Sequence, residues 1–171
     1  MSTSTQSLTS WAMSRFSALY DSPAEFQAEA TTTNTSSFES HIRSMFSKDA
    51  QIFVNHDGPM NAQDFQKHLG QTFGANKTEV EWKECFETED AENSTQGEPK
   101  NGIVAGYLIV TRTLKFRIRA TPAKNYTHIS LSAKIAHDEQ STEADKRRIT
   151  QMFFTSVTKA APVHIQGAVR H

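Results

Sequence analysis

The sequence predicts an α+β domain in which three amphipathic helices pack on one face of a curved antiparallel sheet. Up to residue 73, apolar side chains recur at helical spacing in three segments. After Gly74 they alternate with polar side chains along four long segments, as in strands that bury one face. Hydrophobic residues make up 36% of the 171 residues and charged residues 22%, a balance that favours one packed core over disorder.

The three helices are predicted from the spacing of their apolar side chains and from the residues that stop them. The first begins at Leu8, and Ser22-Pro23 ends it because a proline disfavours helical geometry in the residue before it. The second starts near Ser36 and ends at Lys48. The third covers residues 62–73, where large apolar side chains repeat every four positions.

The strands are predicted from two-residue alternation. A short strand over residues 50–55 and a turn at 56–59 come before the third helix, since Asp-Gly and Gly-Pro both favour turns. Polar or charged loops separate four longer predicted strands, which cover residues 78–88, 102–120, 126–137 and 149–160. The second of these is long for one strand, so we expect a bend or bulge near Gly106.

The domain prediction is a single unit over residues 8–165, with a disordered start at 1–7 and a tail at 166–171. No stretch approaches the roughly 20 apolar residues of a membrane span. The first residues have neither the basic start nor the apolar run of a signal peptide. Cys85 is the single cysteine, which excludes an internal disulfide. These features predict a cytoplasmic protein without a membrane partner.

One passage adds a family resemblance to this outline. In FESHIRSMFSKDAQIFVNHDGPMNAQDFQKHL, residues 38–69, an amphipathic helix ends in an F-x-x-D-A turn. A strand with a polar end, a glycine turn and an x-D-F helix start follow. This order resembles the nuclear-transport-factor-2-like superfamily, and the resemblance extends over about residues 8–165. It implies a cystatin-like cone with a pocket between helices and sheet, and a homodimer. The superfamily includes ketosteroid isomerases, SnoaL-type cyclases, scytalone-type dehydratases and non-catalytic transport adaptors, so fold alone does not decide function.

The polar cluster Asn55-His56-Asp57 at the end of the first predicted strand is one candidate site. In isomerase-like members a carboxylate near this place is the general base, and Asp57 is the nearest match here. A partly desolvated carboxylate could move a proton, with His56 assisting and Asn55 binding the ligand. The alternative is that Asp57 is an ordinary Asp-Gly turn residue.

Tyr20 and two strand residues complete the candidate catalytic set. The Tyr20 hydroxyl could donate to a ligand oxygen, or simply lie at the rim of the core. Uninterrupted alternation places Glu84 with Trp82 and Phe86, and Arg112 with the apolar positions of its own strand. Because an unpaired buried charge is costly, these two groups line a pocket or form an ion pair, unless a bulge reverses the alternation.

Other chemistries find little support in the sequence. The seven histidines have no metal-ligand spacing, and acidic neighbours disfavour a reactive Cys85 thiolate. A net charge of −1 gives no general basic field for nucleic acid. The stripe Lys115, Arg117 and Arg119 is basic, but without interleaved aromatic residues we expect an exposed sheet face there.

Two functions therefore remain after the sequence analysis. The first is a protein that binds a small apolar ligand, and could be an isomerase, cyclase or dehydratase working by acid-base chemistry without metal or organic cofactor. Its pocket would be lined by Phe53, Trp82 and Phe86, with Tyr20 or Arg112 holding an oxygen. The alternative is a non-catalytic interaction module that binds a protein partner through its sheet face.

Overall fold

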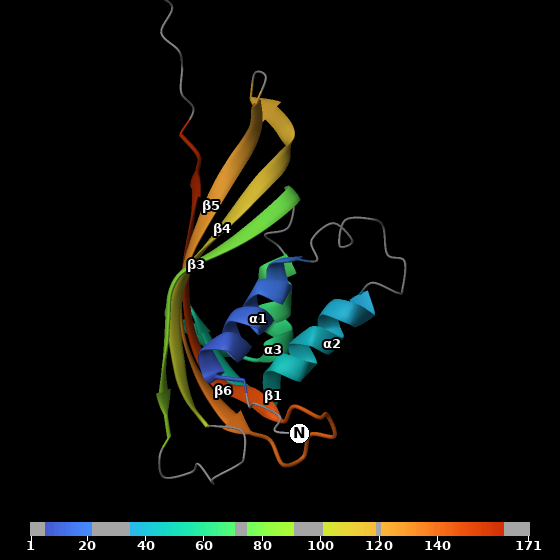
Figure 1. The fold of residues 1–171 in the computed structure, drawn as a ribbon. Coiled ribbons are helices and arrows are strands. Elements are labelled where there is room, and N and C mark those ends of the chain that lie inside the picture. Colours follow the sequence, from blue (N-terminus) through green and yellow to red (C-terminus); the bar gives the residue numbers. More distant parts are fainter. Residues whose placement is uncertain (1–5, 22–34, 71–74, 91–100, 119–120, 163–171) are drawn as a thin grey trace, which may run out of the picture.

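The computed structural model describes residues 6–21, 35–70, 75–90, 101–118 and 121–162. These residues form an α+β fold with three helices and six strands. In chain order the elements are α1 (Leu8–Asp21), α2 (Thr35–Met45), β1 (Phe46–Val54), β2 (Asp57–Met60), α3 (Ala62–Gly70), β3 (Ala75–Glu89), β4 (Gly102–Ile118), β5 (Thr121–His137) and β6 (Arg147–Ala160). All six strands belong to one open, curved sheet (Figure 1).

The strand order is β2-β1-β6-β5-β4-β3, which corrects the predicted sheet in one respect. β1 pairs with β6 in parallel, whereas the other four strand pairs are antiparallel. The sheet is therefore mixed and not wholly antiparallel. The parallel pair joins distant parts of the chain, with α3 and three long strands between them, as parallel pairing requires a long connection. The three helices do not all come before the sheet, since α3 follows β1 and β2.

The helices pack against one face of the sheet, which we call the inner face; the opposite one is the outer face (Figure 1). α1 buries one side of its helix against β3 and β4 because its apolar side chains recur every three or four positions. The sheet contributes alternate residues, so Met152 and Phe154 are buried while Phe153 between them is 51% exposed. The largest fully buried side chains are Trp11, Tyr20, Phe16, Phe65, Leu8 and Leu19.

A β-bulge in β3 decides which residues of this strand face the helices. Trp82 pairs with Leu108 and Glu84 with Tyr107, so Lys83 is the extra residue. Because one extra residue reverses the alternation, Glu84 and Phe86 lie on the outer face. Phe86 is 63% exposed. The prediction that these two side chains point into the cone is therefore wrong. The reason is a bulge that reverses the alternation, which the sequence had left open as an alternative.

The same bulge turns Glu87 towards α1. Its carboxylate Oε2 accepts a hydrogen bond from the backbone N of Thr9 at 2.6 Å, and so satisfies one of the free amides at the start of the helix. Gly106 pairs with Cys85 in this region, and a Cβ added at Gly106 would lie 2.7 Å from the Trp82 ring. The absence of a side chain at Gly106 thus lets the Trp82 ring approach the backbone of β4. The register shift between β4 and β5 lies further on, between Thr113 and Arg117.

Several predictions fall on residues outside the described part of the chain. These are residues 1–5 of the expected disordered start, the tail at 166–171, and the side chains of the basic stripe at 115, 117 and 119. The backbone O atoms of Gln6 and Ser7 accept hydrogen bonds from Arg147 and Trp11.

Among the described residues, no helix combines the length and apolar character that crossing a membrane demands.

Candidate functional site

Asn55 and His56 form the tight turn between β1 and β2. Both have positive φ, 51° and 71°, as the two-residue turns of β-hairpins require. Asn55 also ties this turn to β6, because its Oδ1 accepts from the backbone N of Ser156 at 2.8 Å. Asn55, His56 and Asp57 are all exposed. Asp57 lies on β2 and Glu84 on β3, the two opposite edge strands, so the structure does not bring these two carboxylates together.

Trp82 and Arg112 do lie on the inner side of the sheet, where they contact Ser17 and Tyr20 of α1. Arg112 is 5% exposed, and its guanidinium carbon lies 5.9 Å from the centroid of the Tyr20 ring. Its Nη1 donates to Thr127 Oγ1 at 3.1 Å. Trp82 Nε1 donates to Ser17 Oγ at 3.0 Å, which joins β3 to α1. The sequence thus predicted correctly that Arg112 points to the apolar side.

Burial controls the protonation of this inner pair. It raises the pKa of Tyr20 far above its ordinary value, against a smaller lowering effect of Arg112. Burial also lowers the pKa of Arg112, while Tyr20 acts to raise it. A phenol with such a high pKa is a hydrogen-bond donor at neutral pH and a poor proton acceptor. The pair could hold an oxygen atom, but its chemistry is that of positioning and not of proton abstraction.

Two open grooves are found elsewhere in the described structure. One, of about 600 Å³, lies between the end of α2, the start of α3 and the loop between β5 and β6. The other, of about 640 Å³, lies where β3 ends and β4 begins, next to the end of β5. None of the nine site residues predicted from the sequence lines either groove. Within the described residues, no group of histidine, cysteine and carboxylate side chains could hold a metal ion.

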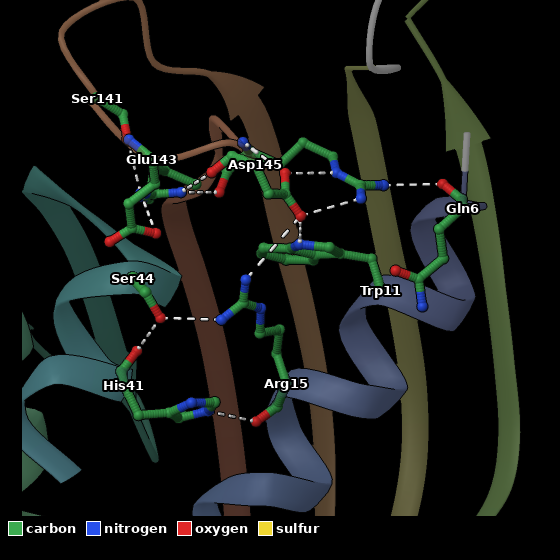
Figure 2. Close-up of polar contacts among 10 residues, drawn as sticks. Gln6, Trp11, Arg15, His41, Ser44, Ser141, Glu143 and Asp145 are labelled. Atoms are coloured by element: carbon green, nitrogen blue, oxygen red, sulfur yellow. Dashed lines mark hydrogen bonds and ion pairs between the residues drawn. The ribbon is translucent and has the colours of Figure 1, made fainter. Parts of the chain in front are cut away.

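A network of hydrogen bonds and ion pairs joins the β5–β6 loop, residues 138–146, to α1 (Figure 2). Its centre is Asp145, whose carboxylate accepts from Trp11 Nε1 at 2.8 Å and from Arg147 Nε and Nη2, both at 3.0 Å. The guanidinium groups of Arg15 and Arg147 lie 5.7 and 5.6 Å from the Trp11 ring centroid. Burial acts to raise the pKa of Asp145, but hydrogen bonds from Arg147 and Trp11 outweigh it, so the pKa is lowered.

Arg148 and α2 extend this network. Arg148 is 4% exposed; its Nη2 donates to Ser141 Oγ at 2.8 Å and lies 2.9 Å from a Glu143 oxygen. Arg15 Nη1 donates to Ser44 Oγ at 2.9 Å, which connects α1 to α2 (Figure 2). These polar groups use one another as partners, so the network holds the loop in place. This network was not predicted from the sequence, because no local pattern links Trp11 to a residue 134 positions away.

The outer face carries the largest exposed apolar side chains of the described residues. Phe86, Ile103, Phe153 and Val157 are 63%, 47%, 51% and 52% exposed. Strand register places five residues side by side across the sheet, and we call them the outer aromatic row. They are Phe86, Ala105, Ser132, Phe153 and Phe53 on β3, β4, β5, β6 and β1. Phe53 and Phe153 stack with centroids 4.9 Å apart. Phe53 therefore belongs to the outer face, and not to a pocket under the helices.

Tyr107 and His128 lie beside the outer aromatic row. The Tyr107 hydroxyl and His128 Nδ1 are 2.6 Å apart, and the two rings stack at an interplanar angle of 13°. His128 pairs across the sheet with Ile109 and Val157. The outer face thus combines exposed aromatic and aliphatic groups on β3, β4 and β6 with the half-buried Phe53 on β1, while β5 contributes Ser130 and Ser132 between them. Clusters of exposed apolar side chains of this kind are typical of protein-binding surfaces.

Comparison with known proteins identifies the fold and goes no further. No family model matches the sequence, and no curated protein matches it. Candida albicans Mtr2 matches with a TM-score of 0.51 and 15% identity, over 88% of this chain and 92% of that one. The complex of C. albicans Mtr2 with the Mex67 M domain matches with 0.51 and 14%, over 89% and 94%. The S. rosetta CaMKII hub follows at 0.47 and 11%, over 81% and 96%. The chain has the nuclear-transport-factor-2-like fold, as its sequence predicts.

Proposed function

We propose that this chain is a non-catalytic interaction module, and that another folded protein packs its apolar surface on the outer face of the sheet. The observation that carries the proposal is the outer aromatic row with its exposed neighbours. Exposed apolar side chains of this size are costly to leave in water, and about 25 cal/mol is gained for each Å² of apolar surface that a partner covers. Aromatic side chains are also the residue type most often found at the centre of interfaces.

The positions of the polar groups support the same function. The candidate acid-base groups Asp57, His56 and Glu84 are exposed and do not converge. A proton-transfer site needs its acid and base within reach of one substrate. The solved structure of a similar fold in complex, Mtr2 with the Mex67 M domain, is compatible with partner binding but does not identify a partner here. A homodimer, which the family resemblance implied, is one way to cover the face.

The test is site-specific photo-cross-linking in cells of the source organism. Ser130 is exposed on β5 next to the outer aromatic row, and it is replaced by p-benzoylphenylalanine in the full chain. The matched control carries the same group at Gln63, exposed on α3 among the helices. We expect one adduct of defined mass that forms from position 130 only.

The double variant Phe86→Ser, Phe153→Ser tests whether this adduct depends on the row. Both side chains are more than half exposed, so the fold is expected to tolerate the change, which circular dichroism and a thermal melt check. The adduct should disappear. If it persists in the folded double variant, or if position 63 gives the same product, the outer face is not the binding surface and the proposal is wrong.

The small-ligand function stays a prediction. Its strongest support is the inner pair Tyr20 and Arg112 with Thr127, which could orient an oxygen atom of a ligand. Phe86, Glu84 and Phe53 do not contribute to that site, because all three lie on the outer face. The interaction function therefore has the larger set of residues in its favour.

A further inference from the structure

Charges on the outer face are distributed unevenly between its two sides. On β3, the lysines are paired within the strand: Lys77 Nζ lies 2.6 Å from a Glu79 oxygen, and Lys83 pairs with Glu81. On β5 and β6, three exposed lysines stand without such partners. They are Lys124, Lys134 and Lys159, and among the described residues no carboxylate oxygen lies within 4.0 Å of any of them. The pKa of Glu79 is lowered chiefly by Lys77, and Lys124 is the smallest of the causes.

The positions of these lysines follow from the register of the strands. Lys134 pairs with Ile103 and Gln151, and each of these three residues is two positions along its strand from a member of the outer aromatic row. Lys159 pairs with Tyr126, above the row, and Lys124 is two residues beyond Tyr126 on the same face. The lysines therefore stand at both ends of the part of β5 and β6 that carries Phe153 and Val157 on the outer face. Ten residues separate Lys124 from Lys134, which corresponds to about 34 Å of strand.

This surface has the area of a specific interface. Four neighbouring strands, β3 to β6, run the whole distance between the lysines and span three strand spacings, or about 14 Å. β1 adds one more spacing over residues 51–54, so the surface covers roughly 550 Å². Two matching surfaces would bury roughly 1,100 Å², just above the area of about 1,000 Å² that a biological interface is expected to exceed.

A second copy of this chain matches the charges poorly. On β3 to β6, the outward side chains that the structure describes include five lysines and three glutamates. Two of the glutamates already pair with Lys77 and Lys83 of their own strand. Two copies face to face would bring ten lysines to six glutamates, and like charges across an interface cost affinity.

We infer that the partner is a different protein, whose docking surface has an apolar centre and carboxylates at both ends, placed over Lys134 and over Lys124 with Lys159. This inference rests on the proposed function and adds the chemistry of the partner. Apolar contacts with the outer aromatic row would supply most of the affinity. The lysines at the two ends would steer association and fix the direction in which the partner lies along the strands.

The test uses the protein that is cross-linked from position 130, once mass spectrometry has identified it and it has been purified. Its dissociation constant is measured against the full chain and against the double variant Lys134→Glu, Lys159→Glu. The control is Lys67→Glu on α3, an exposed lysine in the helical layer. We expect the double variant to bind about tenfold or more weakly at 50 mM NaCl. At 500 mM NaCl, where screening acts within a few ångströms, we expect less than about threefold. The control should stay within about twofold.

The other outcomes distinguish a failure of the acidic-partner inference from a failure of the proposed function. If the captured protein is a second copy of this chain, or if the lysine reversals leave its binding unchanged, the acidic partner is wrong while the proposed function stands. If the Phe86→Ser, Phe153→Ser variant binds the purified protein as well as the unchanged chain does, the proposed function fails together with this inference. Sedimentation velocity of the chain alone measures its oligomeric state independently. A stable dimer that the Phe153→Ser change dissociates would also contradict the inference that the partner is a different protein.

Discussion

Phe153 and Phe154 are neighbours in β6, yet they lie in opposite environments. Phe154 is 3% exposed and meets the Phe65 ring edge-on at 5.4 Å in the inner core, whereas Phe153 is 51% exposed and stacks on Phe53. The inner face buries its apolar groups under the helices. Next to the β5–β6 loop, the charged side chains Asp145, Arg147 and Arg148 form hydrogen bonds within the network. The outer face leaves both aromatic side chains and lysines available. This difference indicates that the inner face stabilises the fold and that the outer face is available for binding.

The largest expected effect is that of truncation on the inner face. Phe154→Ala removes a buried ring from a close-packed core and leaves a cavity, so the free energy of unfolding should fall by about 3 to 5 kcal/mol. Urea unfolding followed by circular dichroism measures the change. A loss below about 1 kcal/mol would contradict the distinction between the two faces.

Removal of the network centre should have the next largest effect. Asp145→Ala leaves the Trp11 indole N–H and the buried Arg147 guanidinium without their main acceptor, so we expect a loss of about 2 to 3 kcal/mol. Glu39→Ala serves as a control, because it breaks an exposed pair with Arg43 within α2 and should cost less than about 0.5 kcal/mol. Equal losses in the two variants would show that the network does not stabilise the fold.

A much smaller effect is expected on the outer face. Phe153→Ala loses the stacking contact with Phe53 but opens no cavity, so its cost should be below about 1 kcal/mol. Cross-linking from position 130 should nevertheless be lost. A variant that is as unstable as Phe154→Ala would place Phe153 in the core and would contradict the difference between the two faces.

The smallest effect concerns pH. The folded pKa of Asp145 is lowered, so this carboxylate contributes stability that is present above its unfolded pKa, about 4, and is lost as pH falls through the folded value. The unchanged chain should therefore lose more unfolding free energy than Asp145→Asn as pH falls from about 5 to about 2. Unfolding curves of the two proteins at several pH values test this, and parallel curves would contradict the assignment.

Local sequence patterns predicted most of the fold. The spacing of Leu8, Trp11, Phe16 and Tyr20 placed α1 correctly, because one helix face must be apolar to reach the core. The parallel pairing of β1 with β6 was not predicted, since nothing in either segment specifies a partner so distant in the chain. The second helix also ends earlier than predicted, at Met45, and Phe46 already belongs to β1.

The candidate site was less predictable, for reasons that particular residues show. Arg112 was placed on the inner face because its strand alternates without interruption up to that point. Glu84 and Phe86 were placed on the wrong face because a bulge adds one residue without a distinctive sequence signature. The Asp145 network depends on long-range contacts, and the charged sequence before β6 resembles any exposed loop.

The extra residue at Lys83 divides β3 into two parts with opposite alternation of inward and outward side chains. Up to Trp82 the strand places its large apolar groups inside; beyond the bulge it places Glu87 inside and Phe86 outside. One residue thereby gives α1 its N-terminal carboxylate and gives the outer face its most exposed aromatic ring. In an evolutionary comparison, a lineage that gained or lost one residue at this position would exchange both properties in a single event, without any substitution at the positions concerned.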